Sequence, residues 1–286
     1  MEHESAIRLG AFAAIFVTVL FAEALFPRRK RVQSRLQRWT TNISITALGA
    51  VVVRVMTLSA VPITATAAAI WASNRGFGIW HAVDWPSWLE IGATLLILDF
   101  AIWFQHILTH RIPGLWRLHR VHHSDRDFDT TNALRFHPIE IACSMLYKTV
   151  IVIALGPSVF AVIVFEIGLN GFALFNHANL HLPKRIDAAL RWILVTPDVH
   201  RIHHSMHRIE HDSNYGFSIT LWDRLFGTFT AQPRDGHQDM TIGLPPYQSA
   251  NPAKLGWSLA LPFARHPAPV PSDPSEPEVA SAIRSL

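Results

Sequence analysis

Long apolar stretches alternate with short polar segments along this chain. The first stretch runs from Ile7 to Phe26, which is about the 20 residues that a helix needs to cross the hydrocarbon of a bilayer. A second runs from Ile43 to Trp71, and a third from Leu89 to Leu108. This pattern predicts three membrane-spanning helices in the N-terminal part of the chain.

Two further apolar segments, Ile139 to Leu155 and Val159 to Phe175, are joined by Gly156 and Pro157. Each has about 17 residues, which is short for a full crossing. They are expected to form a hairpin, complete or re-entrant, that returns the chain to the side it left. We therefore expect an all-α integral membrane bundle of about four membrane-embedded helices or hairpins.

Composition supports the membrane assignment. Half of the 286 residues are hydrophobic and only 16% are charged, and the mean hydropathy is +0.21, whereas a soluble protein usually carries about a quarter charged residues. No AxA-like cleavage site follows the first apolar stretch, so we expect it to be a retained anchor. The single cysteine, Cys143, excludes an intrachain disulfide and a CxxC metal site.

The net charge is +4, and basic residues gather between the first two apolar stretches. Such a cluster indicates a cytoplasmic loop beside anionic headgroups and not a nucleic-acid surface. It places the N-terminus outside and the loop of residues 27–41 inside the cell. The residues are Arg28, Arg29, Lys30, Arg31, Arg35 and Arg38.

Arg54 stands inside the second apolar stretch, where a charge is costly. Either the side chain reaches the interface from a tilted helix, or it has a buried partner. Asp99 and Glu166 are the candidate partners, and the first interpretation is favoured.

Histidines form four clusters between Trp103 and His207, which read HILTH, HRVHH, HANLH and HRIHH. A spacing of three or four residues stacks imidazoles on one face of a helix. The order HxxxH followed by HxxHH occurs twice, which is hard to obtain by chance and indicates a metal site. The ten candidate ligands are His106, His110, His119, His122, His123, His177, His181, His200, His203 and His204.

Ten imidazoles exceed the ligands of one zinc ion and suit two metal ions with four or five nitrogens each. Imidazole binds Zn, Cu, Fe and Ni, so the ligand type alone does not select the metal. The chain has neither the ExxH pairs of carboxylate-bridged di-iron bundles nor the HExxH of zinc hydrolases. A metal transporter is the alternative, but its ligands would lie near the bilayer midplane, whereas these lie at span ends.

Other polar residues lie near the histidines. Asp99 lies on the same helix face as His106 but about 10 Å from it by helical rise, which is too far for a direct hydrogen bond. It is expected either to form a hydrogen bond with a histidine of another helix or to be an ordinary buried polar residue. Glu166 lies on the face of His177, as part of a pocket wall or of plain helix–helix hydrogen bonding. His137 precedes a proline and sits in extended backbone, where it supports the ligands or the fold.

The chain divides into three regions. Residues 1–88 are an N-terminal membrane anchor region, 89–235 a catalytic domain, and 236–286 a polar, Pro-rich and partly disordered tail. Counting crossings from the basic loop places every histidine cluster on the cytoplasmic side. We therefore expect a cytosolic, histidine-rich helical cap on the bundle.

From about Asp99 to Thr230 the sequence resembles the fatty acid hydroxylase and sterol desaturase superfamily of membrane di-iron oxygenases. The matching elements are DxxxxxxHxxxH, LWRLHRVHHSD, TNALRFHP, FNHANL, TPDVHRIHHS and NYG followed by WDRLFGT. By this resemblance, Arg135 and Asn179 support the ligands. In the bacterial members the recurrent element is HxN, so His181 has the weakest support of the ten.

The resemblance implies two iron ions and an enzyme that uses O2 to hydroxylate or desaturate a C–H bond of a lipid or sterol-like substrate. An alkyl C–H bond has no acidic proton, so it requires a redox cofactor and not acid–base side chains. Hydroxylation is favoured by its frequency in the family. No cytochrome b5-like haem domain is fused, so a separate donor of ferredoxin or cytochrome type is expected, and the location is expected to be a bacterial inner membrane.

Overall fold

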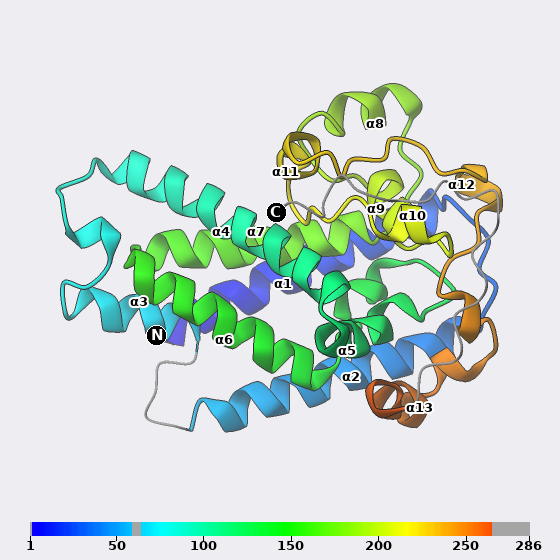
Figure 1. Ribbon diagram of the computed structural model, residues 1–286, viewed down its shortest axis with the longest axis horizontal. Coiled ribbons are helices and arrows are strands. Elements are labelled where there is room, and N and C mark those ends of the chain that lie inside the picture. Colours follow the sequence, from blue (N-terminus) through cyan, green and yellow to red (C-terminus); the bar gives the residue numbers. More distant parts are fainter. Residues whose placement is uncertain (1, 59–63, 265–286) are drawn as a thin grey trace.

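The computed structural model describes residues 2–58 and 64–264, and the secondary structure of these residues is helical. Five helices are long and apolar enough to cross a membrane, so the predicted all-α membrane bundle is confirmed. In Figure 1 these helices extend toward one end of the molecule, and most of the short helices gather at the other end. The five are α1 (Glu2–Leu25), α2 (Arg35–Met56), α4 (Ser87–Arg111), α6 (Pro138–Leu155) and α7 (Val159–Asn176).

The short elements build the cap and the connections between the long helices. The α-helices among them are α3 (Ala65–Ser73), α5 (Pro113–His123), α8 (Lys184–Leu190), α9 (Pro197–His203), α10 (Arg208–His211), α11 (Leu221–Leu225), α12 (Gly236–Asp239) and α13 (Leu255–Ala260). The 3-10 helices are η1 (Ile79–His81), η2 (Thr130–Leu134), η3 (Pro245–Tyr247), η4 (Asn251–Ala253) and η5 (Leu261–Phe263).

The apolar stretch from Ile43 to Trp71 is not one helix. Its first part belongs to α2, which begins eight residues earlier at Arg35 and ends at Met56. The chain then starts α3, whose N-cap Thr64 accepts a hydrogen bond from the amide of Ala67. Four alanines of α3 are buried, three of them in one cluster with residues of α4, α6 and α7, and hydropathy does not distinguish such a buried helix from a lipid-facing one.

Two local sequence signals explain where helices begin or end in the structure. Thr196 is the N-cap of α9, Pro197 is its first residue, and the Thr196 hydroxyl accepts a hydrogen bond from the amide of Val199. Gly156 ends α6 in the left-handed region with a φ of 64°. A Cβ atom at Gly156 would lie only 2.2 Å from the carbonyl oxygen of Phe77, so only glycine fits this turn.

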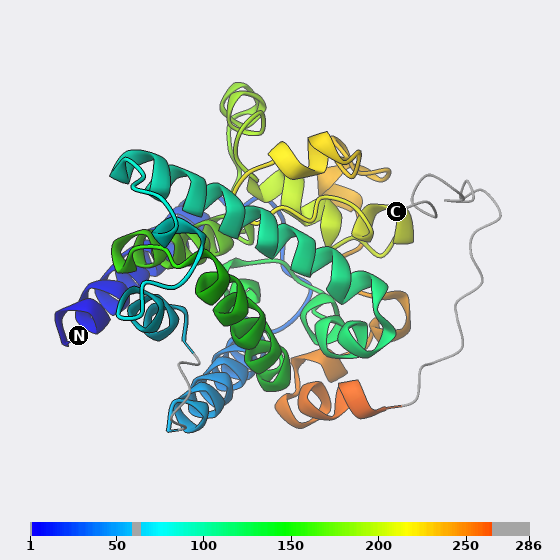
Figure 2. The same cartoon turned by 60° about the vertical axis from the view of Figure 1, so that its left-hand side comes forward.

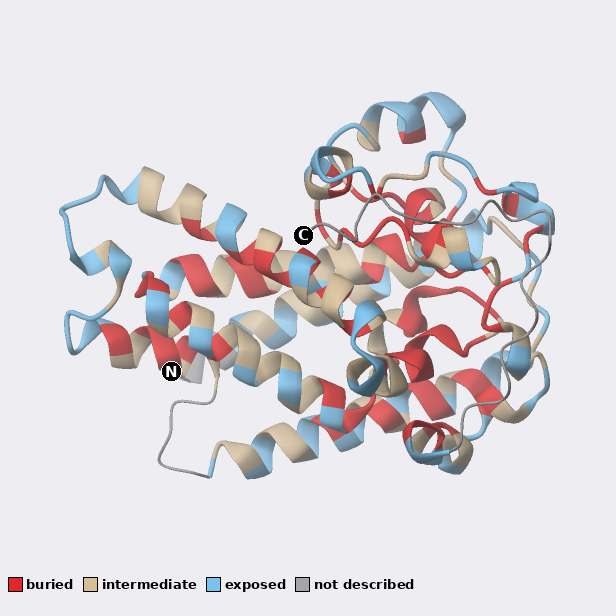
Figure 3. Ribbon diagram, viewed as in Figure 1, coloured by how far each residue is buried: buried red, intermediate tan, exposed pale blue. Residues whose placement is uncertain are grey.

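Residues of the membrane bundle are more exposed than residues of the cap. Figure 3 shows buried residues concentrated toward the end that holds α5 and α9, while α1 is mostly exposed or half-buried. Only 6% of the apolar window in α1 is buried, and its exposed side chains, such as Val17 and Phe21, suit contact with lipid.

The first part of the predicted C-terminal tail is folded. Residues 236–264 pack on α2 and α5 through Ile45, Val121 and Leu261, and Thr41 donates a hydrogen bond to the carbonyl of Ala253 at 2.7 Å. The disorder predicted from Arg265 onward lies outside the described residues.

The basic cluster makes more protein contacts than a headgroup-binding loop requires. The guanidinium of Arg28 pairs with Asp198 at 3.1 Å, and that of Arg29 donates to the carbonyls of His237 and Met240. Arg38 lies fully buried in the first turn of α2. The sequence could not reveal these partners because they lie 87 to 211 residues away along the chain.

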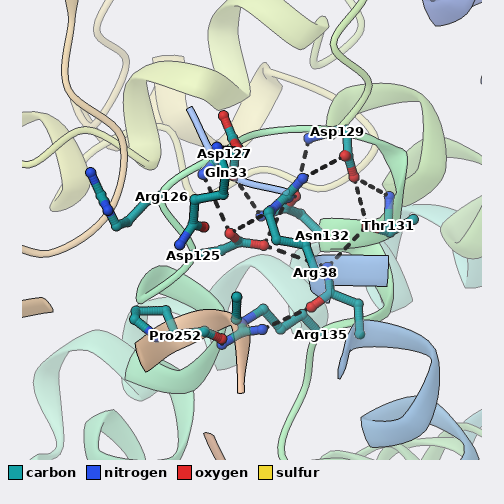
Figure 4. A network of polar contacts seen from close by, with 12 residues as sticks. Gln33, Arg38, Asp125, Arg126, Asp127, Asp129, Thr131, Asn132, Arg135 and Pro252 are labelled. Atoms are coloured by element: carbon teal, nitrogen blue, oxygen red, sulfur yellow. Dashed lines mark hydrogen bonds and ion pairs between the residues drawn. The ribbon is translucent and has the colours of Figure 1, made fainter. Parts of the chain in front are cut away.

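Arg38 is the centre of a buried ion network, shown in Figure 4. It binds Asp125 through two nitrogens at 2.8 Å, Asp129 at 2.6 Å and the side-chain oxygen of Asn132 at 2.8 Å. Asp127, in the same loop, accepts the amides of Val32 and Gln33. The network therefore ties α2 and the basic loop to the segment that follows α5.

We predict that Arg38→Gln will lower the free energy of unfolding by about 3–5 kcal/mol, because Asp125 and Asp129 would stay buried without their cation. Urea unfolding in detergent, followed by tryptophan fluorescence, measures the change. The control Arg35→Gln removes an exposed guanidinium that stacks on Trp39 and should cost below about 1 kcal/mol.

The difference in unfolding free energy between wild type and Arg38→Gln should also depend on pH. Burial alone would raise the pKa of Asp125 and Asp129, but the Arg38 charge outweighs it and lowers both pKa values. A carboxyl with a lowered folded pKa stabilises the fold above its unfolded pKa of about 3.9 and loses this contribution as the pH falls through the folded value. The gap between wild type and Arg38→Gln should therefore shrink below about pH 4, and a constant gap would contradict this assignment.

Candidate metal centre

Four segments deliver the histidines to one end of the bundle. α4 carries His106 and His110 in its last two turns, and α5 follows at once and packs back against it. His177 is the C-cap of α7, and α9 with its C-cap carries the last cluster. In Figure 1 and in the turned view of Figure 2, α5 and α9 lie toward the end of the molecule away from the N-terminus, and α4 and α7 run along the bundle toward them.

Nine of the ten predicted histidines form two groups, and within each group one nitrogen per residue lies within 4.8 Å of the others. The first group, called here site A, consists of His106, His110, His119, His123 and His203. The second, called site B, consists of His122, His177, His200 and His204. The two sites are adjacent, since the rings of His123 and His204 are 4.6 Å apart.

Backbone carbonyls determine which nitrogen faces each site. Nδ1 of His106 lies 2.7 Å from the carbonyl of Tyr215, Nδ1 of His203 lies 2.6 Å from that of Ser213, and Nδ1 of His177 lies 2.8 Å from that of Ala173. A carbonyl oxygen only accepts, so each Nδ1 carries the proton. Each Nε2 of these three neutral rings therefore presents a lone pair.

These lone pairs point at one another in site A. Nε2 of His106 lies 3.1 Å from Nε2 of His203 and 3.1 Å from Nε2 of His119. Two acceptor nitrogens cannot share a hydrogen bond, so His106 and His203 repel each other unless a cation lies between them. This donor set fits a metal ion, which accepts several neutral imidazole nitrogens at once.

Site B has the same character. Nε2 of His177 lies 3.2 Å from Nε2 of His122 and 3.0 Å from Nε2 of His200. Both ring nitrogens of His204 are buried without a hydrogen-bond partner among the described residues, and in site A the same holds for Nε2 of His110 and Nε2 of His123. Buried unpaired nitrogens are costly, and metal coordination would satisfy them.

The electrostatics favour neutral rings. Burial first, and then the neighbouring imidazoles, lower the pKa of His122, His123, His200 and His204 well below the ordinary histidine value. The pKa of His203 is lowered well below that value by burial and by His106. Neutral imidazole is the form that binds metal, so these residues need not release protons at neutral pH.

Two of the predicted candidates lie apart from both sites. His181 is exposed, and its backbone amide donates to the carbonyl of Phe26 at 2.8 Å. His137 is buried as the N-cap of α6, where its Nδ1 accepts a hydrogen bond from the amide of Ile139. The structure therefore brings neither imidazole to a metal group.

The two candidate carboxylates do not contact the histidine nitrogens of either site. Asp99 accepts a hydrogen bond from Nε1 of Trp222 at 2.8 Å. Glu166 accepts one from Lys148 at 2.5 Å and pairs with Arg8 at 2.6 Å. Arg54 is exposed at the end of α2 and forms an ion pair with neither carboxylate.

Arg135 and Asn179 act on the backbone around the histidines. Arg135 is fully buried, and its Nε donates to the carbonyl of Val121, between His119 and His123 in α5. The side chain of Asn179 exchanges hydrogen bonds with the backbone of Arg29, at 2.9 Å in each direction. Arg135 thus holds the end of α5, and Asn179 holds the basic loop beside His177.

Sequence reasoning missed Glu140 and Asp212. Oε1 of Glu140 lies 2.6 Å from Nδ1 of His119, and Oδ1 of Asp212 lies 3.4 Å from Nδ1 of His110. A carboxylate bonded to the outer nitrogen of a ligating histidine orients the ring and raises its basicity. The available signal was a glutamate in the first turn of a largely apolar helix, α6.

A cavity of about 710 Å³ opens beside site A, within the volume range of ligand sites. His106 and His119 form part of its wall together with Phe136 and Phe217. The cavity continues between the long helices, where Thr46, Gly49, Ala50, Val53, Ile141, Met145 and Leu169 line it. It therefore connects the histidines to the interior of the membrane bundle.

Residues 91–228 match the family described as Fatty acid hydroxylase. The chain is 33% identical over 163 residues to the alkylglycerol monooxygenase of Xenopus tropicalis, covering 57% of this chain and 34% of that protein. It is 29% identical over 233 residues to the ornithine lipid hydroxylase OlsE of Rhizobium tropici, covering 80% of this chain and 69% of that protein. The chain spans about a third of the length of the alkylglycerol monooxygenases it matches, and no solved structure matches it.

We predict that removing one ligand from one site will release about half of the bound metal, because the two donor sets are separate. His110→Ala should empty site A, and His204→Ala should empty site B. Metal analysis of the purified variants by mass spectrometry measures this. His81→Ala, which removes an exposed imidazole in η1, should retain all the metal, and equal losses in all three variants would contradict the assignment.

Glu140→Gln should weaken metal binding about 10-fold to 100-fold, because the amide keeps the shape but loses the charge that orients His119. Competition with a chelator of known affinity measures this change. Asp84→Asn alters an exposed carboxylate outside both sites and is the matched control. Equal metal affinity in the two variants would show that Glu140 does not act on the metal.

Proposed function

We propose that this protein, whose residues 91–228 match the fatty acid hydroxylase family, is a membrane oxygenase that uses O2 to hydroxylate an unactivated C–H bond of a lipid. The observation that carries the proposal is the position of site A on the wall of a cavity that leads into the apolar bundle. A lipid chain could reach the histidines through this cavity along the apolar part of its wall, which includes Val53, Ile141, Met145 and Leu169. The relatives are named as a monooxygenase of alkylglycerol and a hydroxylase of ornithine lipid, which supports a lipid substrate.

Two iron ions are the proposed cofactors, one held by the five histidines of site A and the other by the four of site B. Bound iron would supply the O2 chemistry that breaks a C–H bond lacking an acidic proton. The choice of iron rests on the family, because imidazole ligands alone also suit zinc, copper and nickel.

The protein's own residues would position the substrate and exclude water. Phe136 and Phe217 flank His106 and His119 in the cavity wall, so an alkyl chain would meet aromatic faces as it approaches site A. Glu140 would hold the His119 ring, and the carbonyl of Tyr215 would hold the His106 ring. A fixed chain in a dry cavity would expose one carbon to the site, and that selects the position of attack.

We infer that the histidine end faces the cytoplasm of a bacterium, from the basic residues that flank α1 and α2 at that end. Electrons would then come from a separate cytoplasmic donor of ferredoxin or cytochrome type. A transport function is not favoured, because both histidine groups lie at one end of the bundle and not along a path across it.

The test uses purified protein loaded with iron and supplied with a ferredoxin, its reductase and membrane lipids. We expect O2 uptake and a lipid product heavier by one oxygen atom, with the oxygen derived from 18O2. His203→Ala should lower the rate at least about 100-fold, since its Nε2 faces those of the other site A ligands. Full iron loading without O2 uptake or lipid change, across several donors, would overturn the proposal.

A further inference from the structure

Large apolar side chains are exposed on one side of the cap. Trp192 is 70% exposed and Leu225 is 65% exposed. Single exposed apolar residues are common on proteins, but a contiguous group of them marks a surface that contacts lipid or another protein. The residues belong to α8, to the loop that follows it and to α11, and are called here the cap patch: Ile186, Trp192, Ile193, Leu221, Leu225 and Phe226.

Hydrogen bonds hold together the two segments that carry the cap patch. The amide of Thr220 donates to the carbonyl of Ile193 at 2.9 Å, and the hydroxyl of Thr220 donates to the carbonyl of Trp192 at 3.2 Å. The guanidinium of Arg224 in α11 lies 4.7 Å from the centre of the Trp192 ring. In Figure 1, α8 and α11 lie on the same side of the molecule. The exposed side chains therefore form one surface.

Contacts with α4 determine the depth of the cap patch. The ring of Phe226 stacks on Trp103 of α4 with centroids 4.8 Å apart, and Nε1 of Trp222 donates to Asp99 at 2.8 Å. Trp103 lies 16 residues beyond Ser87, the first residue of α4, which is an advance of about 24 Å along the helix. The hydrocarbon of a bilayer is about 30 Å thick, so a spanning α4 places Trp103 in the leaflet on the histidine side.

The cap patch continues the lipid-facing surface of α4. Phe104 is exposed on α4, and its ring lies 6.3 Å from that of Phe100, which in turn lies 6.0 Å from the ring of Phe226. α4 is long and apolar enough to cross a membrane, so the exposed ring of Phe104 meets acyl chains. An apolar surface that continues from it at the same depth meets acyl chains as well. A soluble partner would have to displace lipid to reach Phe226.

The polar residues beside the cap patch suit the boundary between acyl chains and headgroups. Lys184 and Arg185 are exposed in the first turn of α8, and Arg224 stacks on Trp192. Tryptophan rings and long basic side chains are enriched at this boundary, because the apolar part of each side chain stays in lipid and the polar end reaches water or phosphate. Figure 3 shows α8 mostly exposed, as expected for a short helix that lies in the interface plane and does not cross the bilayer.

We propose that the cap patch is inserted in the leaflet on the histidine side. The apolar side chains of α11 and of residues 192–193 lie among the upper acyl chains, and Lys184 and Arg185 lie at anionic headgroups. This inference goes beyond the proposed function, because it does not require that the protein consume O2. Ile193 lies three residues before the N-cap of α9, so the inserted segment would fix the position of the metal centre relative to the bilayer surface.

The test measures the surroundings of single side chains by spin-label accessibility. Cys143 is the only cysteine of the chain, so Cys143→Ser gives a background without thiols. Leu225→Cys and Trp192→Cys, each made in this background and labelled with a nitroxide, are reconstituted in nanodiscs of phosphatidylcholine and phosphatidylglycerol that hold one copy of the full chain. Collision of the label with O2, which concentrates among acyl chains, is compared with its collision with a water-soluble nickel chelate.

Three further exposed positions calibrate the measurement. Val17→Cys in α1 is the reference in the membrane, and Gln238→Cys in α12 is the reference in water. We expect the ratio of O2 to nickel accessibility at Leu225 to be at least about 5-fold higher than at Gln238 and close to that at Val17. Arg185→Cys should give an intermediate ratio, because it lies at the headgroups.

Other results would contradict the insertion. Ratios at Leu225 and Trp192 equal to that at Gln238 would place the cap patch in water and overturn the inference. Labels screened from both reagents in single-copy nanodiscs would show a packed protein contact, with the same consequence. Labels screened from both reagents in liposomes of many copies, but open to the nickel chelate in single-copy nanodiscs, would assign the surface to a second copy of the chain and not to lipid.

Discussion

The convergence of unprotonated imidazole nitrogens is the constraint on which the rest of this structure depends. Nε2 of His203 and of His106 face each other at 3.1 Å as lone pairs, because backbone carbonyls hold the protons on their other nitrogens. Such an arrangement is repulsive without a cation, so the fold must supply rigidity that keeps the rings in place. The carbonyls of Ser213 and Tyr215 supply part of it, and they lie in a loop that Asp223 fixes by accepting the amides of Tyr215 and Gly216.

The buried charges around Arg38 supply another part of this rigidity. The segment after α5 would otherwise be a polar loop, yet Arg38 binds Asp125 and Asp129 in it, and Arg135 binds the carbonyl of Val121. Buried ion pairs contribute little net stability compared with apolar packing, but they tolerate only one geometry. Here that geometry links the start of α2, which is a membrane helix, to the helix that carries three of the histidines.

Local periodicity explains which features the sequence predicts. The histidine clusters and the long helices follow from spacings of three to four residues and from runs of apolar residues, so nine of the ten proposed ligands lie in the two groups. Features that depend on residues far away in the sequence could not be predicted from local periodicity. The break between α2 and α3, the burial of Arg38 and the contact of Glu140 with His119 depend on tertiary neighbours. His181 fits the local pattern, but the chain turns away after His177, where Pro27 and Leu180 form an isolated bridge.

The membrane bundle and the metal centre are connected through α6. Its first turn carries Glu140, which contacts His119 of site A, and two turns later Lys148 lines the same cavity and pairs with Glu166. A helix is stiff over this length, so the distance between Glu140 and Lys148 is fixed by the rise per residue and not by loop conformation. In the proposed oxygenase, this stiff helix would fix the position of the cavity wall relative to His119 and so help to determine which carbon of an alkyl chain faces site A.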